Sequence, residues 1–548
     1  MTARIQIGLV AGLSLIAVLA VVAFRPAAPS LGSSQALCAT RPASASASSS
    51  GGSGAKAPVT SGRNVWSFAS APGLHPMRVS VAADRAGTAP GQIFVAPYST
   101  GQMVGQTGPL ILDNAGNPVW YRPLPSARIE AADFQVQTYH NTQTGTSQPV
   151  LTWWQGTLAI PPAYTNLPAG APEPGGCYYI YDSHYRLVRT ISAQNGFDAD
   201  EHEFLLTPQG DALFIASRPV HMDLRRYGGP KNGAVEDSEV QEVSLATGKL
   251  VFTWDMLQHV NLADSEVSAS SASSSDGVWD AYHMNSLDVG PGGQLLISAR
   301  SMWAVYDVSM STGKILWQLG GKTSDFTLGT NAGFYWQHDA RFRSGQMISM
   351  FDDGCCNPPN AKPEQQSHGL ILKLDFQDHK ATVVTSYYHH AALYSPSQGN
   401  LQALGNGNQL VGWGQSQYYS EYAAAGNSQS NASASLLYDA KMPGSNISYR
   451  VFRDPWVGTP YYPPSAAARA SGGRSVVYAS WNGSTQTTAW QVLAGPNPHS
   501  LSVVAGHVAT SGFQTAVTTA NHGPYFQVRA LSAAGNVLGT SPVVKLSS

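Results

Sequence analysis

The feature that most constrains this chain is a repeated strand–turn–strand pattern in which two kinds of hairpin alternate. Copies of the first kind, most of them closing on an aromatic residue, begin at Pro109, Cys177, Val240, Trp303 and Gly369, and a degenerate copy begins near Ser435. Copies of the second kind begin at Asp133, His202, His283, His338 and Gly399. Successive copies of the first kind lie about 60–70 residues apart, and self-similarity at a fixed period predicts a repeat architecture.

Two hairpins in each period supply four strands, which is the content of one blade of a β-propeller. Six copies of the first hairpin therefore predict an all-β fold with a six-bladed β-propeller over residues 63–460. Helical periodicity is absent, so the competing interpretation is another all-β array, such as an irregular solenoid. Only 12% of the residues are charged, whereas Gly and Pro number 54 and 35, a composition typical of short strands and turns.

The two ends of the chain differ from the repeats. Residues 1–26 contain Arg4 and an uncharged, mostly apolar run from Ile5 to Phe24, which fits either a cleaved signal peptide or a retained membrane anchor. Residues 27–62 are rich in Ser, Ala, Gly and Pro and predict a flexible linker. Both interpretations predict an extracytoplasmic protein, secreted or held at the membrane by its N-terminal segment.

Residues 465–548 show alternating strand patterns after a Pro-rich stretch, with Trp481, Trp490 and Tyr525 at positions that suit a small core. This tail resembles a fibronectin type III module, a small β-sandwich. The chain has four cysteines, Cys38, Cys177, Cys355 and Cys356. Export permits disulfides, but the spacing of these cysteines does not show which of them pair.

Three histidines occupy the same position in three successive repeats, because His202, His283 and His338 each open the second kind of hairpin. The innermost strand of each blade lines the central channel of a propeller, so equivalent starts predict that the three imidazoles meet at one mouth of the channel. An antiparallel hairpin returns its last residue beside its first. We therefore expect Arg300 near His283 and Arg218 near His202.

Histidines and arginines in one pocket favour a tetrahedral oxyanion, because guanidinium groups are permanent cations with planar donor forks. Imidazole acts as nucleophile, acid or base near neutral pH. The sequence thus predicts a sulfuryl or phosphoryl guest, with no metal or cofactor, and the net charge of −2 argues against nucleic acid as a partner. Asn285 shares the face of His283, and Trp154 and Trp336 are candidates for the walls of an aryl pocket. Glu201, Glu203 and Asp339 flank the histidines and either orient them or, by strand alternation, point away.

Several long motifs in the same order resemble the arylsulfotransferase family, in particular its large, less studied branch. They span roughly Trp66 to Pro463 and include DEHEFLLTPQGDALFIA, YHMNSLDVGPGGQLLISAR, TGKILWQLGG, FYWQHDARFRSGQMISMFDD and GNLQALGNGNQLVGWGQ. The resemblance implies a six-bladed propeller that moves a sulfuryl group from a phenolic sulfate ester to a phenol, without a nucleotide donor, by a ping-pong reaction through a sulfated histidine. The adjacent Cys355 and Cys356 follow these motifs and are not part of them.

Carried over residue by residue, the resemblance implies that His338 is the nucleophile and that His283, Asn285 and Arg300 hold the sulfuryl oxygens. His202 would then assist proton transfer at the phenolic oxygen.

Three other interpretations stay open. The TGKILW motif suggests a quinoprotein-like propeller, although only two partial repeats of this kind occur. The three histidines suit Zn²⁺, although nearby arginines disfavour a cation. The anchor, linker and terminal module suit a non-catalytic binding protein at the cell surface.

Overall fold

The computed structural model describes residues 62–126, 129–157, 175–273, 277–356, 366–520 and 523–547. Strands dominate these ranges, and the all-β prediction is confirmed. The helical segments there are one turn of α-helix and short 3₁₀ turns, namely η1 (Arg225–Tyr227), α2 (Met256–His259), η2 (Leu262–Asp264), η3 (Ala269–Ser273) and η4 (Arg300–Met302). No helix in this part of the chain is long and apolar enough to cross a membrane. The predicted signal peptide or anchor (1–26) and the predicted linker up to residue 61 lie outside the described residues.

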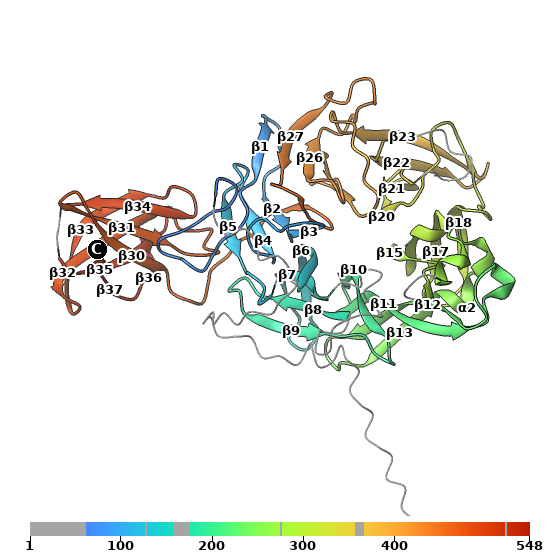
Figure 1. Ribbon diagram of the computed structural model, residues 1–548, viewed down its shortest axis with the longest axis horizontal. Coiled ribbons are helices and arrows are strands. Elements are labelled where there is room, and N and C mark those ends of the chain that lie inside the picture. The colour runs from blue at the N-terminus through green and yellow to red at the C-terminus, as the bar shows by residue number, and fades with distance from the viewer. Residues whose placement is uncertain are drawn as a thin grey trace, which may run out of the picture.

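Most strands form antiparallel meanders of chain neighbours, and Figure 1 shows these meanders arranged in a ring. Two of them share one sheet, in which the first meander comprises β6 (Glu130–Asn141), β7 (Thr146–Thr157), β8 (Gly175–Tyr181) and β9 (Leu187–Ile191). The second comprises β10 (Asp198–Leu206), β11 (Asp211–Met222), β12 (Gly233–Ser244) and β13 (Leu250–Asp255), with the short β14 (Val278–Trp279) beside β12. A single pair of residues, Gly176 and Ala199, joins the two meanders through β8 and β10.

The next meanders form separate sheets. One comprises β15 (Met284–Gly290), β16 (Gln294–Ala299), β17 (Ala304–Ser309) and β18 (Ile315–Gly320). The following one comprises β20 (His338–Arg343), β21 (Met347–Asp352), β22 (His368–Asp375) and β23 (Lys380–Tyr388), with β19 (Thr327–Leu328) at its edge. A third comprises β24 (Asn400–Ala403), β25 (Gln409–Gly412), β26 (Tyr418–Tyr422) and β27 (Leu436–Lys441).

Strands from the two ends of the repeat region pair with each other and close the ring. β1 (Ser80–Asp84) adds to β27, and β29 (Phe452–Asp454) adds to the sheet of β2 (Gln92–Val95), β4 (Leu110–Leu112) and β5 (Pro118–Tyr121). A short pair of β3 (Tyr98–Ser99) and β28 (Asn446–Ile447) lies beside them in the chain. This pairing of strands from the two ends ties the first and last repeats into one body. The number of blades remains a prediction.

The apolar core lies between neighbouring meanders. Side chains of β11 and β12 form one cluster with those of β15 and β16, including Ile215, Val240 and Ile297. The chain turns at Thr312 between β17 and β18, and the next residue, Gly313, takes a left-handed φ of 70° that favours glycine. The indole N–H of Trp254, at the end of β13, donates to the carbonyl of Gly313 over 2.9 Å. This hydrogen bond therefore links the meander that ends in β13 to the turn between β17 and β18 of the next meander.

The C-terminal strands form two sheets of their own, to one side of the ring (Figure 1). The first consists of β30 (Ser465–Ser471), β31 (Arg474–Ser480) and β34 (Gln514–Thr519). The second consists of β32 (Ala489–Asn497), β33 (Ser500–Ala509), β35 (Tyr525–Leu531), β36 (Val537–Thr540) and β37 (Val544–Lys545). A shared core that includes Val477, Trp490 and Phe526 joins them. Two hydrogen bonds of 2.8 and 2.9 Å between Asn482 and the backbone of Tyr121 dock this unit on the ring. Its fibronectin type III-like identity remains a prediction.

Candidate active site

Three histidines from the first strands of three successive meanders converge at one place in the ring. His202 lies in β10, His283 directly precedes β15, and His338 begins β20. Ring nitrogens of the three side chains lie within 4.8 Å of one another, and the ring centroids of His202 and His283 are 4.9 Å apart. The structure thus brings together the residues that the repeat position singled out.

Each of these strands is irregular where its histidine lies. The pairing register shifts between Ala199 and Phe204 in β10, and comparable shifts follow Met284 in β15 and His338 in β20. His283 has a φ of 50°, in the left-handed region that only a few non-glycine residues adopt. Bulges of this kind re-aim side chains next to functional sites. They turn the imidazoles toward one another at the cost of regular pairing.

A carboxylate holds the Nδ1 atom of every histidine in the trio. Asp200 and Asp353 lie 2.6 Å from Nδ1 of His202 and His338, respectively. Asp280 is hydrogen-bonded to Nδ1 of His283. A carboxylate on Nδ1 orients the ring and leaves Nε2 for chemistry, as in metal sites and catalytic triads. Each histidine therefore presents its Nε2 side to the shared space.

Sequence reasoning missed these carboxylates and named Glu201, Glu203 and Asp339 instead. Glu201 does approach Nδ1 of His202, at 3.9 Å, but Glu203 and Asp339 pair with arginines. The available signal was the close spacing of Asp200 and Asp280 to their histidines, two and three residues before them. In a regular strand, residues two apart share a face, so the strand pattern contained the signal for Asp200, whereas Asp280 and Asp353 lie outside the strands of the hairpins.

His338 is held as a neutral imidazole whose Nε2 carries a lone pair. The backbone N–H of Gln398 donates to Nε2 over 3.1 Å, and a backbone N–H is always a donor. Nδ1 therefore bears the proton and donates it to the carboxylate of Asp353. Burial, together with the positive charges of Arg300 and the other two histidines, keeps the pKa of His338 well below the usual value for histidine. This nitrogen has the protonation state of a nucleophile.

The pKa of His202 is shifted in the opposite direction, upward. Burial disfavours its charged form, but the negative charges of Asp200 and Glu201 outweigh burial and raise the pKa of His202 to about 9. Near neutral pH it is an imidazolium, so its Nε2 is a proton donor. Two histidines in one site with pKa values displaced in opposite directions are suited to different roles, one as base or nucleophile and one as acid.

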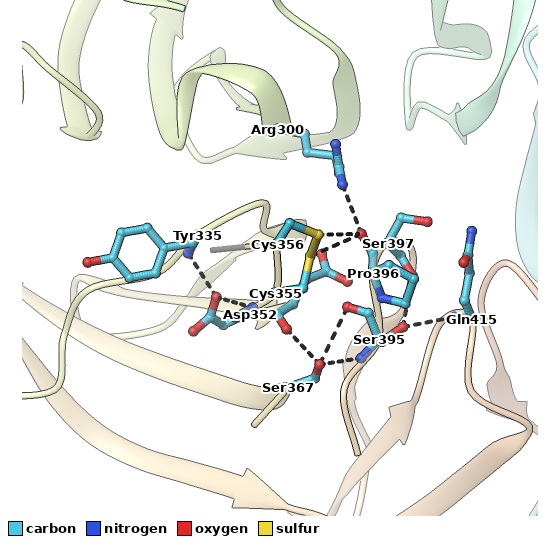
Figure 2. Close-up of a disulfide and its surroundings, with 12 residues drawn as sticks. Arg300, Tyr335, Asp352, Cys355, Cys356, Ser367, Ser395, Pro396, Ser397 and Gln415 are labelled. Atoms are coloured by element: carbon cyan, nitrogen blue, oxygen red, sulfur yellow. Dashed lines mark hydrogen bonds between the residues drawn. A yellow bond between two sulfur atoms is a disulfide. The ribbon is translucent and has the colours of Figure 1, made fainter. Parts of the chain in front are cut away.

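Arg300 supplies a fixed cation beside the trio. Its backbone N–H donates to the carbonyl of His283 over 2.9 Å, and its Nη2 donates to the carbonyl of Pro396 over 2.8 Å (Figure 2). Its guanidinium lies 4.7 Å from the centroid of the half-buried Trp336 ring. The buried Nε of Arg300 finds no hydrogen-bond partner within the described ranges. A buried donor without a partner next to three imidazoles is suited to an anionic guest.

The other predicted residues lie elsewhere. Asn285 is fully buried, and its Nδ2 donates to the carbonyl of Gln337 over 2.7 Å, so it ties β15 to the start of β20. Trp154 is 1% exposed and donates to the carbonyl of Ala199, which places it in the core. This buried position contradicts the prediction that Trp154 forms a wall of an aryl pocket, because no face of the ring is free.

The prediction that Arg218 lies near His202 and binds the substrate is the second one to correct. It faces Asp237 across β11 and β12, with 3.7 Å between Nε and Oδ2, and its guanidinium stacks on Phe197 at 4.1 Å. The irregular β10 breaks the equivalence between the two hairpins. Arg218 therefore pairs with an acid of its own sheet, whereas Arg300 stays with its histidine.

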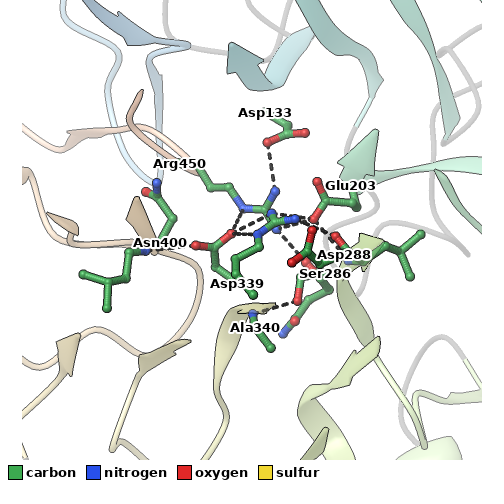
Figure 3. A network of polar contacts seen from close by, with 12 residues as sticks. Asp133, Glu203, Ser286, Asp288, Asp339, Ala340, Asn400 and Arg450 are labelled. Atoms are coloured by element: carbon green, nitrogen blue, oxygen red, sulfur yellow. Dashed lines mark hydrogen bonds and ion pairs between the residues drawn. The ribbon is translucent and has the colours of Figure 1, made fainter. Parts of the chain in front are cut away.

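A buried ion network lies next to the histidines (Figure 3). Arg450 is 1% exposed and contacts Asp133 at 2.9 Å and Glu203 at 3.1 Å. Arg341 contacts Glu203 and Asp339, both at 2.7 Å. These residues come from strands far apart in the sequence, so the network joins opposite parts of the ring.

Tyr449 connects this network to the site. Its ring lies 5.4 Å from that of His202 and 6.5 Å from that of His338, and the guanidinium of Arg450 lies 5.1 Å from it. The Tyr449 hydroxyl donates to the carbonyl of Asn285 over 3.3 Å. Tyr449 therefore forms a floor against which two of the imidazoles pack.

Replacing Arg450 with methionine is expected to lower the free energy of unfolding by about 3–5 kcal/mol, because it leaves buried carboxylates without their cation. Chemical denaturation of the wild-type and variant proteins measures this difference. The matched control is Arg225→Met, since Arg225 and Asp223 form an exposed pair whose loss has little effect on stability. Equal stability of R450M and R225M would contradict the assignment of a structural role to the network.

The three histidines also form a group of side chains that could hold a metal ion among the described residues. Three imidazoles with carboxylates behind them suit Zn²⁺. The neighbouring Arg300 and the N–H of Gln398 directed at Nε2 of His338 both disfavour a cation and favour an anion. The second such group is His389, His390 and Asp439, outside the site. There, Asp439 and the backbone N–H of Ala391 already occupy both ring nitrogens of His389.

Comparisons with known proteins identify one family. The family model described as arylsulfotransferase (ASST) matches residues 176–434, just under half of the chain. No curated protein matches the chain. Solved structures include a protein of unknown function from Bacteroides caccae, with 11% identity, 66% of this chain and 98% of that chain covered, and a TM-score of 0.36.

Two further structures are the periplasmic gluconolactonase PpgL of Pseudomonas aeruginosa and virginiamycin B lyase of Staphylococcus aureus. The first is 12% identical, with 84% and 97% of the two chains covered and a TM-score of 0.34. The second is 9% identical, with 63% and 85% covered and a TM-score of 0.30. TM-scores this low support no inference about this chain. The family match does support one, because the matched residues include the histidine trio and Arg300. Residues 176–434 match the model of the arylsulfotransferase (ASST) family, in agreement with the sequence motifs.

Proposed function

We propose that this protein is a nucleotide-independent aryl sulfate sulfotransferase. It moves a sulfuryl group from a phenolic sulfate ester to a phenolic acceptor by a ping-pong reaction, through a sulfated His338. The meanders of the ring are the six blades of a β-propeller, and the histidines lie at one mouth of its channel. The family match of residues 176–434 supports sulfuryl transfer as the reaction class.

The observation that carries this proposal is the opposite protonation of two histidines beside one arginine. His338 is neutral with a lone pair on Nε2, and His202 is an imidazolium whose pKa is raised to about 9. Arg300 offers a buried N–H that has no hydrogen-bond partner among the described residues. Nucleophile, acid and oxyanion donor are the three groups that an attack on a sulfate ester requires.

In the first half-reaction, the hydrogen bond from the Gln398 N–H to Nε2 of His338 breaks, and the freed lone pair attacks sulfur. The bond between sulfur and the phenolic oxygen breaks, and its electron pair leaves with that oxygen, which receives the proton from His202. Arg300 and His283 stabilise the sulfuryl oxygens, and Trp336 packs against the aryl ring. The carboxylate of Asp353 balances the positive charge that the imidazole acquires when Nε2 bonds to sulfur.

In the second half-reaction, a new phenol enters and gives its proton to His202, which is now neutral. The phenolate oxygen attacks sulfur, the N–S bond breaks, and its electron pair returns to Nε2 of His338. Phenols suit this step because their pKa of about 10 is far below that of water or alkyl alcohols. No water and no cofactor takes part in the balance.

The activity assay uses the purified protein with a nitrophenyl sulfate as donor and phenol as acceptor. We expect release of nitrophenol that depends on the acceptor, and one added sulfuryl group on the intact protein after incubation with donor alone. Absence of turnover with every phenolic acceptor would favour a non-catalytic binding protein. Stoichiometric metal in the purified protein would overturn the proposal and favour a three-histidine metal site.

The pH dependence of the first half-reaction tests the role of His202. Below pH 9 it is protonated and supplies its proton, so single-turnover release of phenol from phenyl sulfate should fall as the pH rises through about 9. Nitrophenolate is a better leaving group, so its release should depend on pH less. The variant His202→Gln should lose the alkaline limb for phenyl sulfate. An unchanged profile in this variant would exclude His202 as the acid.

We also propose an extracytoplasmic location, secreted or anchored by the N-terminal segment, with small aryl sulfates and phenols as partners. The apolar run from Ile5 to Phe24 supports export. The terminal unit from residue 465 onward is a fibronectin type III-like spacer or docking module without its own chemistry. Its docking through Asn482 supports a fixed orientation on the propeller.

A further inference from the structure

The disulfide between adjacent residues Cys355 and Cys356 lies beside the histidine site. These cysteines follow β21 in the loop that carries Asp353, the partner of Nδ1 of His338. Cys355 is half-buried and Cys356 is exposed. Their sulfur atoms lie 3.3 and 3.9 Å from the carbonyl oxygen of Pro396 (Figure 2). A disulfide sulfur has no proton to donate, so these contacts are packing contacts.

Pro396 belongs to a second loop that contacts the other side of the same imidazole. Two residues after it, the backbone N–H of Gln398 donates to Nε2 of His338 over 3.1 Å. The carbonyl of Pro396 also accepts the 2.8 Å hydrogen bond from Nη2 of Arg300. One carbonyl oxygen therefore connects the disulfide, the arginine of the site and the segment that reaches the nucleophile.

Ser367 connects the two loops at a second point. Its hydroxyl donates to the carbonyl of Asp353 and accepts from the backbone N–H of Ser395, both over 2.6 Å (Figure 2). The Asp353 loop and the Ser395–Gln398 segment thus form one connected unit. Between them they supply both hydrogen bonds that set the orientation and the tautomer of His338.

The backbone of this unit is strained where it meets the site. Cys356 has a φ of 68° and Gln398 a φ of 72°, both in the left-handed region that disfavours residues with a Cβ atom. Such conformations persist only where the surroundings enforce them. A disulfide between neighbouring residues closes a covalent ring, which restricts the conformations of the dipeptide. The two sulfur atoms pack against the carbonyl of Pro396. Without the bond, nothing covalent keeps Cys356 in this conformation.

We propose that the Cys355–Cys356 disulfide is a positioning element of the active site, which holds Asp353 and Gln398 on the two nitrogens of His338. This inference rests on the proposed sulfuryl transfer through His338. Reduction of the S–S bond to two thiols loosens the two connected loops, and the carboxylate of Asp353 then leaves Nδ1 of His338 for part of the time. The nucleophile becomes less well oriented, while the groups that bind the aryl ring stay in place.

The experiment reduces the folded full-length protein with dithiothreitol, which supplies two electrons and two protons and becomes a cyclic disulfide. Alkylation and mass mapping establish that Cys355 and Cys356 are reduced. We expect kcat to fall by about 10- to 100-fold, because small displacements of a reacting group have effects of this size. The KM for donor should stay the same. Loss of stability alone would reduce the amplitude of the nitrophenol burst, whereas loss of orientation lowers the burst rate at full amplitude.

The variant with Cys355→Ser and Cys356→Ser is the matched control. It should show the lower kcat without reductant and no further response to it. This comparison also removes the effect of dithiothreitol on Cys177, which is disulfide-bonded as well. Reoxidation of the reduced wild-type protein should restore kcat, which separates the effect from unfolding.

Hydrogen–deuterium exchange gives a readout that does not depend on activity. The Gln398 amide is bonded to His338, so its peptide should exchange faster after reduction and in the double serine variant. An active wild-type protein whose kcat and Gln398 exchange are unchanged by verified reduction would overturn the inference. A protein that transfers no sulfuryl group in either redox state would instead overturn the proposed function, and the exchange data would still decide the role of the disulfide.

Discussion

Replacing His338 with asparagine is expected to lower kcat for sulfuryl transfer by about 10⁴-fold or more, because the nucleophile is lost. The side-chain amide of asparagine places its Nδ2 near the position of Nδ1 in histidine and still donates to Asp353. This matters because His338 and Asp353 are 1% and 0% exposed, and an unpaired carboxylate there would destabilise the protein. Acceptor-dependent release of nitrophenol and the mass of the protein after incubation with donor measure the effect.

The matched control for H338N is His389→Gln. His389 is also 1% exposed and pairs with a buried aspartate, Asp439, over 3.2 Å, but it lies outside the trio. This variant should keep the wild-type rate and the covalent sulfuryl adduct. An H338N protein that still acquires one sulfuryl group from the donor would exclude His338 as the site of the covalent intermediate.

Replacing Asp353 with asparagine should lower kcat by about 10²- to 10⁴-fold while leaving the overall fold in place. The carboxylate holds the Nδ1 proton and balances the charge on the imidazole when Nε2 bonds to sulfur. An asparagine amide fails in either orientation. Its oxygen accepts the Nδ1 proton without a negative charge, and its nitrogen would force the proton onto Nε2 and remove the lone pair.

The rate of the nitrophenol burst before steady state measures this change directly, since it reports the first half-reaction alone. Asp439→Asn is the matched control, because Asp439 is 2% exposed and serves His389 in the same way. A burst in D353N as fast as in the wild-type protein would show that Asp353 has no part in the attack on sulfur.

The fold class and the histidine trio were predictable because both depend on the repeat. A fixed period of hairpins indicates that equivalent residues occupy equivalent places, so His202, His283 and His338 had to lie close together if the repeats closed into a ring. The place of Arg300 beside His283 follows from hairpin pairing, which is local. These inferences use neighbours in sequence or in the repeat and need no knowledge of distant contacts.

The partners of the histidines were not predictable, because local irregularities decide them. Register shifts at the start of β10, β15 and β20 break the alternation of side chains that a strand pattern assumes. Asp280 reaches Nδ1 of His283 from outside β15, and Asp353 reaches Nδ1 of His338 from the loop after β21. Arg218 pairs with Asp237 of its own sheet. A bulge costs regular hydrogen bonds and is compensated by contacts from other meanders, which the pattern of one strand does not contain.

The sequence by itself determined the repeat, the all-β class and the three residues around which the site is built, because these follow from periodicity and strand pairing. Only the tertiary structure decided the chemistry of each histidine. Gln398, 60 residues from His338 along the chain, sets its tautomer, and Arg450, 317 residues from Asp133, anchors the floor of the site. Protonation depends on burial and on charges within a few ångströms, and closure of the ring is what brings those charges together.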